Sequence, residues 1–169
     1  MPENYYMYFI TALLPLVVGA IYYNPKVMGN TWMKVNGFKE DDLKGGNMLM
    51  IFGLSYLYGI MLSLAFGYVV VHQTGVFQTM MPDILESGSQ AQTEFNNLMA
   101  SYGNNFRTFG HGAVHGLIFS VLFVLPVIAI NAMFERRGWK YIGIHFIYWL
   151  ITLVLIGGVL SKTLTWASL

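Results

Sequence analysis

Histidine is the residue type in this sequence with the clearest capacity for chemistry. His111 and His115 are four positions apart, so on a helix both imidazoles lie on one face, about 6 Å apart along the axis. His72 lies at the end of the preceding apolar stretch and is the expected third member. Imidazoles bind zinc, copper and haem iron. The three histidines are therefore a candidate cofactor-binding site, for haem or for a transition metal.

Two other roles fit the same histidines: structural hydrogen bonds, and the handling of a proton or a small ligand. The fourth histidine, His145, is expected about 15 to 20 Å away in depth, which makes it a poor ligand for the same site. The chain has no cysteine and no His-Glu-x-x-His motif, which excludes thiolate sites and the zinc-protease arrangement. Because no catalytic constellation is found, the sequence favours a protein that is not an enzyme.

The composition indicates that membrane-spanning helices hold these side chains. Hydrophobic residues make up 56% of the 169 residues and charged residues only 10%, whereas soluble domains carry about 25% charged residues. The net charge of +1 provides no basic field for a polyanion, so nucleic-acid binding is excluded as a function.

Four apolar stretches have the length that a helix needs to cross a bilayer, about 20 residues. They contain no Asp, Glu, Lys or Arg and cover residues 6–23, 48–71, 112–134 and 141–160. Helices are expected because each backbone polar group in lipid must be paired within its own segment. The expected fold is all-α: a single transmembrane domain over residues 1–169, built as a four-helix bundle of two helical hairpins with short interfacial helices in the loops.

The distribution of basic residues predicts the orientation of these helices. Four lysines lie in the first connecting loop and three basic residues in the third, against Arg107 in the loop of residues 72–111 and Lys162 in the C-terminal tail. Because cytoplasmic loops carry the excess of Lys and Arg, the first and third loops are expected in the cytoplasm. Both termini and the loop 72–111 are then extracytoplasmic.

The first two loops contain signals for helices of their own. In the first loop, apolar residues recur at helical spacing up to Gly37, which predicts a short helix in the membrane interface. In the loop 72–111, Ser89 and Gln92 have the spacing of a capping box, and apolar residues follow at helical spacing from Phe95. This loop is the best candidate for a partner-binding surface.

Small residues recur every four positions in the second and third apolar stretches. This spacing allows two helices to approach closely, so it predicts helix-packing faces. Packing within the bundle is favoured over packing between copies, because two neighbouring helices each carry such a face. The residues are Ser55, Gly59, Ser63 and Gly67 in the second stretch and Gly112, Gly116 and Ser120 in the third.

A polar and aromatic cluster marks the expected cytoplasmic end of the third stretch. Such a cluster is typical of a membrane boundary and suits anionic headgroups. It consists of Asn131, Glu135, Arg136, Arg137, Trp139 and Lys140.

Two parts of the sequence resemble the domain-of-unknown-function 1761 family of small four-helix bacterial membrane proteins. The first part is Gly19–Tyr23 with Pro25, Trp32–Lys34 and Gly37–Lys44, and the second is Asn131–Lys140 with Tyr148, Trp149 and Gly157. The resemblance implies four helices in a bacterial inner membrane. It implies no reaction, because the family has none assigned, and the histidine pair lies outside the family pattern.

Three functions remain open at this stage. The favoured one is a non-enzymatic accessory or assembly subunit, or a self-associating bundle, with the lipid bilayer and other membrane proteins or itself as partners. The second is a haem- or metal-binding membrane module that uses His111 and His115. The third is a small transporter or lipid-binding protein, which ranks last because no charged residue at mid-depth could line a pore.

Overall fold

The computed structural model describes residues 3–165, and its regular structure in that range is helical, with no strand. The all-α prediction is confirmed. The elements, in chain order, are α1 (Tyr6–Thr11), α2 (Leu14–Tyr22), a π-helical turn (Pro25–Gly29), α3 (Asn30–Asn36), a 3₁₀ turn (Glu40–Leu43), α4 (Met48–Val70), α5 (His72–Thr79), a 3₁₀ turn (Asp83–Leu85), α6 (Gln90–Tyr102), α7 (Phe109–Phe119), a π-helical turn (Ser120–Val124), α8 (Leu125–Phe134) and α9 (Trp139–Thr163).

Three helical segments among the described residues are long and apolar enough to cross a membrane. They are α4, the continuous stretch Phe109–Phe134 that includes α7 and α8, and α9. The first predicted span differs. It is a pair of helical stretches, Tyr6–Tyr22 and Pro25–Asn36, that are bent by 56° and form a fourth span only if counted together.

Prolines account for the interruptions in these segments. Pro15 lacks an N–H and its ring clashes with the carbonyl four residues earlier, which is that of Thr11, where α1 ends. Pro126 follows the π-helical turn Ser120–Val124 in the same way. Pro25 opens the second half of the bent pair, after Asn24 has turned to an extended conformation. The helices are therefore interrupted near prolines, where the regular hydrogen bond to the carbonyl four residues earlier cannot form.

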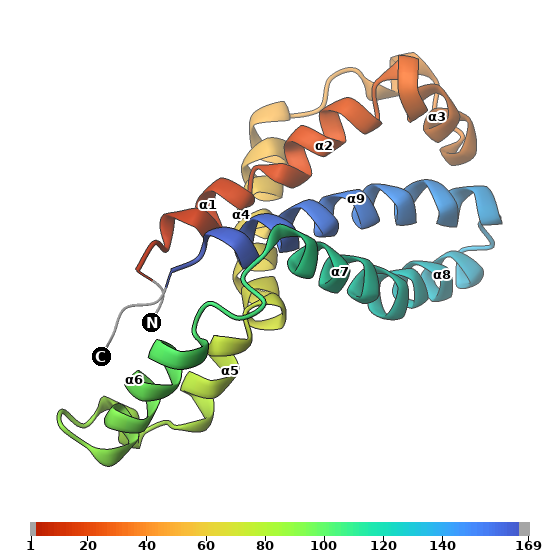
Figure 1. The fold of residues 1–169 in the computed structure, drawn as a ribbon. Helices are drawn as coiled ribbons and strands as arrows, with labels where there is room; N and C mark the ends of the chain where they lie inside the picture. Colours follow the sequence, from red (N-terminus) through yellow and green to blue (C-terminus); the bar gives the residue numbers. More distant parts are fainter. Residues whose placement is uncertain (1–2, 166–169) are drawn as a thin grey trace.

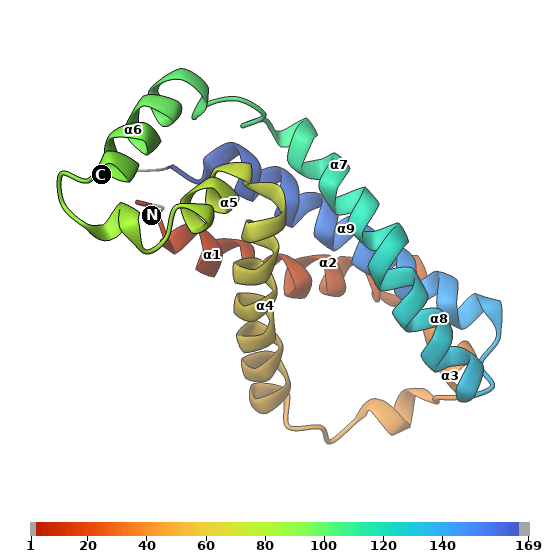
Figure 2. The ribbon, with the colours of Figure 1, turned by 90° about the horizontal axis from the view of Figure 1, so that it is seen from below.

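The α7–α8 segment and α9 run antiparallel and side by side (Figures 1 and 2). The close approach requires glycine at two positions of α7: a Cβ on Gly112 would lie 2.5 Å from Gly157 C, and one on Gly116 would lie 2.5 Å from Leu153 O. The Ser120 hydroxyl is buried and donates to Gly116 O at 2.7 Å. This face of α7 therefore packs within the molecule.

The small residues of α4 contact α1 and the residue that follows it. A Cβ on Gly59 would lie 2.5 Å from Ala12 O, and one on Gly67 would meet the Tyr8 ring. Ser63 accepts a hydrogen bond from the Thr11 hydroxyl at 3.1 Å. Ser55, one turn before Gly59, is only half-buried. Around these contacts, the main apolar core joins α1, α4 and α9.

Helix α4 does not run alongside the others over its whole length. Its N-terminal half diverges from α8 and α9 (Figure 2), and Leu49 there is 87% exposed. A closed bundle of two hairpins, as expected from the sequence, is therefore not confirmed. The physical reason is that the small-residue contacts with α1 fix only the middle and the C-terminal half of α4.

The predicted helices in the two loops are confirmed. Helix α3 ends at Gly37, which has the left-handed φ of 76° that glycine adopts without strain. Helix α6 begins after Ser89, whose hydroxyl accepts a hydrogen bond from Gln92 N at 3.1 Å. Helices α5 and α6 form an outer hairpin with its own small core of Phe77, Ile84 and Phe95, visible as the lower projection in Figure 1.

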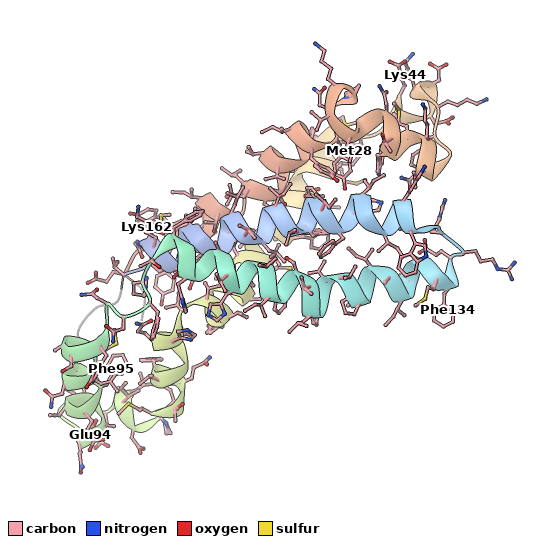
Figure 3. The ribbon with its side chains drawn as sticks, turned by 45° about the vertical axis from the view of Figure 1, so that its right-hand side comes forward. Met28, Lys44, Glu94, Phe95, Phe134 and Lys162 are labelled. Atoms are coloured by element: carbon pink, nitrogen blue, oxygen red, sulfur yellow. The ribbon has the colours of Figure 1, made fainter. Side chains whose placement is uncertain are left out.

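The two ends of the molecule differ in character (Figure 3). Met28 and Lys44 from the first loop lie at the same end as Phe134, whereas Glu94 and Phe95 of the outer hairpin lie at the opposite end. The loops that carry most of the basic residues therefore share one end.

Candidate functional site

The three candidate histidines are positioned by two different elements at the end of the molecule that carries the outer hairpin. Helix α4 ends at Val70, and the extended backbone of Val71 (φ −111°, ψ 94°) turns the chain so that His72 begins α5. His111 and His115 lie in the first two turns of α7. The Thr108 hydroxyl caps that helix by accepting a hydrogen bond from His111 N at 3.2 Å.

The structure brings the three side chains together at one point. His111 Nε2 lies 2.9 Å from His72 Nε2 and 3.0 Å from His115 Nε2. One ligand nitrogen from each of the three lies within 4.8 Å of the other two. His72 is exposed and the other two histidines are half-buried, so the cluster can be reached from the surface of the protein at His72.

Hydrogen bonds between the three imidazoles do not account well for this arrangement. An imidazole nitrogen has a single in-plane position, which holds either a proton or a lone pair. His111 Nε2 approaches two other Nε2 atoms at hydrogen-bond distance, and one position cannot point at both. If each of the three Nε2 atoms carries a lone pair, the three nitrogens can instead bind one cation together. This convergence of nitrogens therefore favours a bound ion over a purely structural role.

The spacing also suits a single metal ion. At a zinc–nitrogen distance of about 2.0 to 2.1 Å, a tetrahedral centre places two ligand nitrogens about 3.3 Å apart, a few tenths of an ångström from the separations of 2.9 and 3.0 Å seen here. Three imidazoles without a thiolate or carboxylate match zinc or copper(II) and do not match magnesium or calcium.

Haem fits the cluster less well. Two axial histidines approach haem iron from opposite faces of a wide, flat ring. Here the His111 and His115 rings come from one helix, with centroids 4.6 Å apart and tilted by 70°. The His72 ring is 5.1 Å from each of them. In this arrangement the rings leave no gap for a porphyrin between them, so their spacing suits a metal ion better than haem.

The chain that leads into α7, residues 103–108, closes over the cluster, and is called the return loop below. The Gln73 amide donates to Gly103 O at 2.9 Å and to Asn105 O at 3.3 Å. Arg107 Nε donates to Ser161 O at 2.7 Å, and Arg107 Nη2 donates to Leu164 O. The return loop is therefore tied to α5 on one side and to the C-terminal end of α9 on the other.

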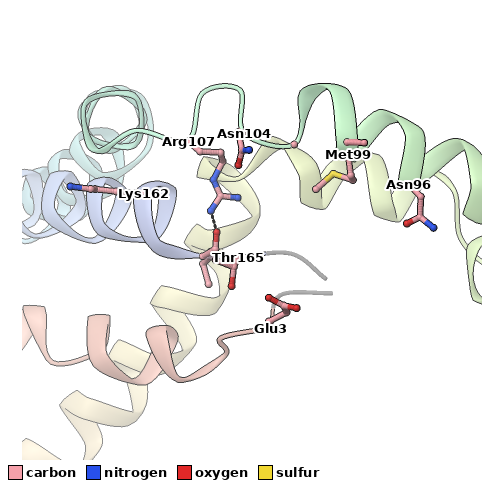
Figure 4. Close-up of a pocket in the computed structure, with 10 residues that line it drawn as sticks. Glu3, Asn96, Met99, Asn104, Arg107, Lys162 and Thr165 are labelled. Carbon is pink, nitrogen blue, oxygen red and sulfur yellow. Dashed lines mark hydrogen bonds between the residues drawn. The ribbon is translucent and has the colours of Figure 1, made fainter. Parts of the chain in front are cut away.

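Arg107 is the half-buried cation of this end of the molecule. Its guanidinium caps the C-terminal end of α9, where carbonyl oxygens lack helical partners. Burial lowers the pKa of Arg107 from its usual value, partly opposed by Tyr8. A cavity of about 610 Å³ lies beside it, lined by residues that include Met99, Asn104 and Thr165 (Figure 4) and by none of the three histidines.

His145 lies outside the cluster, near the opposite end of α9. Its Nδ1 is 3.3 Å from the Tyr23 hydroxyl, and its ring packs against Tyr141 with centroids 4.4 Å apart. Its Nε2 is buried with no hydrogen-bond partner among residues 3–165. His145 is therefore no ligand of the three-histidine site in this structure.

The boundary cluster does not assemble into a site. Arg137 Nε lies 3.9 Å from Glu135 Oε2, and the Arg137 guanidinium lies 5.5 Å from the centre of the Tyr141 ring. Arg136 has a left-handed φ of 57° at the end of α8. The side chains of the cluster are exposed, and they are Asn131, Glu135, Arg136, Arg137, Trp139 and Lys140.

Sequence reasoning missed the contribution of Gln73, Phe106 and Arg107. Each acts through a contact with a residue 30 or more positions away or through an unusual backbone conformation. The one usable signal was Arg107 itself, an isolated cation in a loop poor in basic residues.

Comparisons with known proteins place the sequence in one family. The chain matches the family described as "Protein of unknown function (DUF1761)" over residues 6–161. No curated protein and no solved structure matches it. The three histidines lie within the matched range.

Proposed function

The chain belongs to the DUF1761 family, whose description assigns no function. We propose that this family member is a small integral membrane protein that binds one transition-metal ion with His72, His111 and His115. The convergence of three Nε2 atoms carries the proposal. Zinc and copper(II) are the ions that three neutral imidazoles suit best.

The proposed site leaves part of the coordination sphere free. Three protein ligands around a four-coordinate ion leave one position for water or another small ligand. His72 is exposed, so an ion can enter from that side. Bound metal would join the start of α5 to α7, and so would stabilise the folded protein by its binding free energy.

The proposed location is the inner membrane of a bacterium, with both termini and the histidine cluster on the extracytoplasmic side. The three to four apolar helices support membrane insertion, and the shared end of the lysine-bearing first loop and the third loop supports this orientation. The orientation is checked by placing a tag at each terminus and treating intact cells with a labelling reagent that does not cross the inner membrane; both tags should react. Tags that react only after lysis would contradict the orientation.

Metal titration of the purified protein tests the proposed function. After removal of metal with a chelator in mild detergent, we expect one Zn²⁺ or Cu²⁺ per chain to bind, with an increase in the melting temperature because the ion binds only the folded site. Elemental analysis gives the stoichiometry. The absence of stoichiometric binding of either ion would contradict the proposal.

An accessory or assembly role is the second candidate, and the exposed half of α4 supports it. Leu49, Phe52 and Tyr58 are 87%, 56% and 61% exposed, so lipid or another membrane protein must cover this face. We expect a complex larger than one chain in mild detergent, measured by native mass spectrometry. A single chain without partners in several detergents would argue against this role.

A further inference from the structure

Phe106 has a backbone conformation that a phenylalanine rarely adopts. Its φ is 62°, in the left-handed region where a Cβ is crowded by the backbone. Its side chain is also 63% exposed, so burial of the ring does not offset this strain. A strained residue of this kind persists only where surrounding contacts hold it, and such residues are concentrated at functional sites.

The contacts that hold Phe106 come from both neighbouring elements. The Ser161 hydroxyl of α9 donates to Phe106 O at 3.1 Å. On the two flanking residues, Asn105 O accepts from Gln73 at 3.3 Å and Arg107 donates to Ser161 O at 2.7 Å. Figure 4 shows Arg107 reaching from the return loop to the end of α9. The backbone at Phe106 is thus fixed on each side of the strained residue.

The strained backbone places the Phe106 ring against the histidine cluster. The ring centroid lies 5.0 Å from that of His111, with the planes inclined by only 34°. The same ring meets His72 edge-on at 6.0 Å. Of the three histidines, Phe106 therefore contacts the two that come from different helices, α5 and α7.

We propose that Phe106 is a positioning residue of the metal site, an inference that rests on the proposed function. Its ring limits rotation of the His111 imidazole and so keeps Nε2 directed at the other two nitrogens. A metal-bound imidazole is electron-poor, and the face of an aromatic ring attracts positive charge. The contact therefore stabilises the metal-bound cluster more than the free cluster.

Four substitutions of Phe106 distinguish the effect of its aromatic ring from the effect of its strained backbone. F106A and F106G both remove the ring, whereas F106G also relieves the strain because glycine adopts a positive φ freely. F106L keeps apolar bulk without an aromatic face, and F106Y keeps the ring. Zn²⁺ affinity is measured by competition with a chromophoric chelator, and the Co²⁺ absorption spectrum reports the ligand geometry.

We expect F106A, F106G and F106L to bind Zn²⁺ about tenfold more weakly, the scale of losses when residues that orient metal ligands are removed. Their Co²⁺ spectra should differ from that of the wild type. F106Y should retain both the affinity and the spectrum. In the absence of metal, F106G should melt at a higher temperature than F106A because its backbone is unstrained.

The outcomes distinguish this inference from the proposed function. Wild-type protein that binds no metal would overturn both. Wild-type binding with unchanged affinity and spectrum in F106L and F106A would overturn only the role of Phe106. If F106A and F106G do not fold, the comparison of F106L with F106Y decides, since both keep a large side chain at this position.

Discussion

The H111A variant should lose metal binding, with an affinity for Zn²⁺ or Cu²⁺ more than about 100-fold below that of the wild type. His111 Nε2 is the atom that lies within 3.0 Å of both other ligand nitrogens. Even a change in a residue that only orients a ligand costs 10- to 100-fold in affinity, so loss of the central ligand must cost more. Isothermal titration with the chelator-stripped protein measures the change.

H145A is the matched control for this variant. It removes the same side chain from another apolar helix, but His145 packs against Tyr23 and Tyr141 far from the cluster. We expect H145A to bind metal with wild-type stoichiometry and affinity. An H111A variant that binds metal as tightly as H145A would show that the ion, if any, is held elsewhere.

The G112A variant should lose about 3 kcal/mol or more of stability, the upper part of the range for overpacked sites. The added Cβ would lie 2.5 Å from both Gly157 C and Ser161 Cβ. The first of these is backbone, so the clash can be relieved only by separating α7 from α9. Unfolding in detergent by heat or by SDS measures the loss.

Separation of α7 from α9 should also change the position of the return loop beside the metal site. The Ser161 hydroxyl donates to Phe106 O, and Ser161 O accepts from Arg107 Nε, so a shift of α9 at Ser161 moves the return loop.

G110A is the control on the same helix, because a Cβ there has no neighbour within 4 Å. Alanine favours the helix over glycine, so G110A should be as stable as the wild type or slightly more. Equal stability of G110A and G112A would contradict the close packing.

Much of this architecture follows from local sequence patterns. The apolar stretches predict α4, α7–α8 and α9, because the length and composition of a span are properties of consecutive residues. The ends of α3 at Gly37 and the start of α6 after Ser89 follow from the backbone preferences of those single residues. The spacing of His111 and His115 places both on one helix face for the same reason.

Other features depend on how helices pack, which local patterns do not encode. His72 and His111 are 39 positions apart, and their contact depends on the rotation of α5 and α7 about their axes. The left-handed Phe106 and the divergence of α4 have no signal in residue type or spacing, because each results from contacts with distant elements. The sequence thus predicts membrane helices and a candidate site of His111, His115 and His72. The distances at which the three nitrogens approach one another arise from long-range packing of the helices.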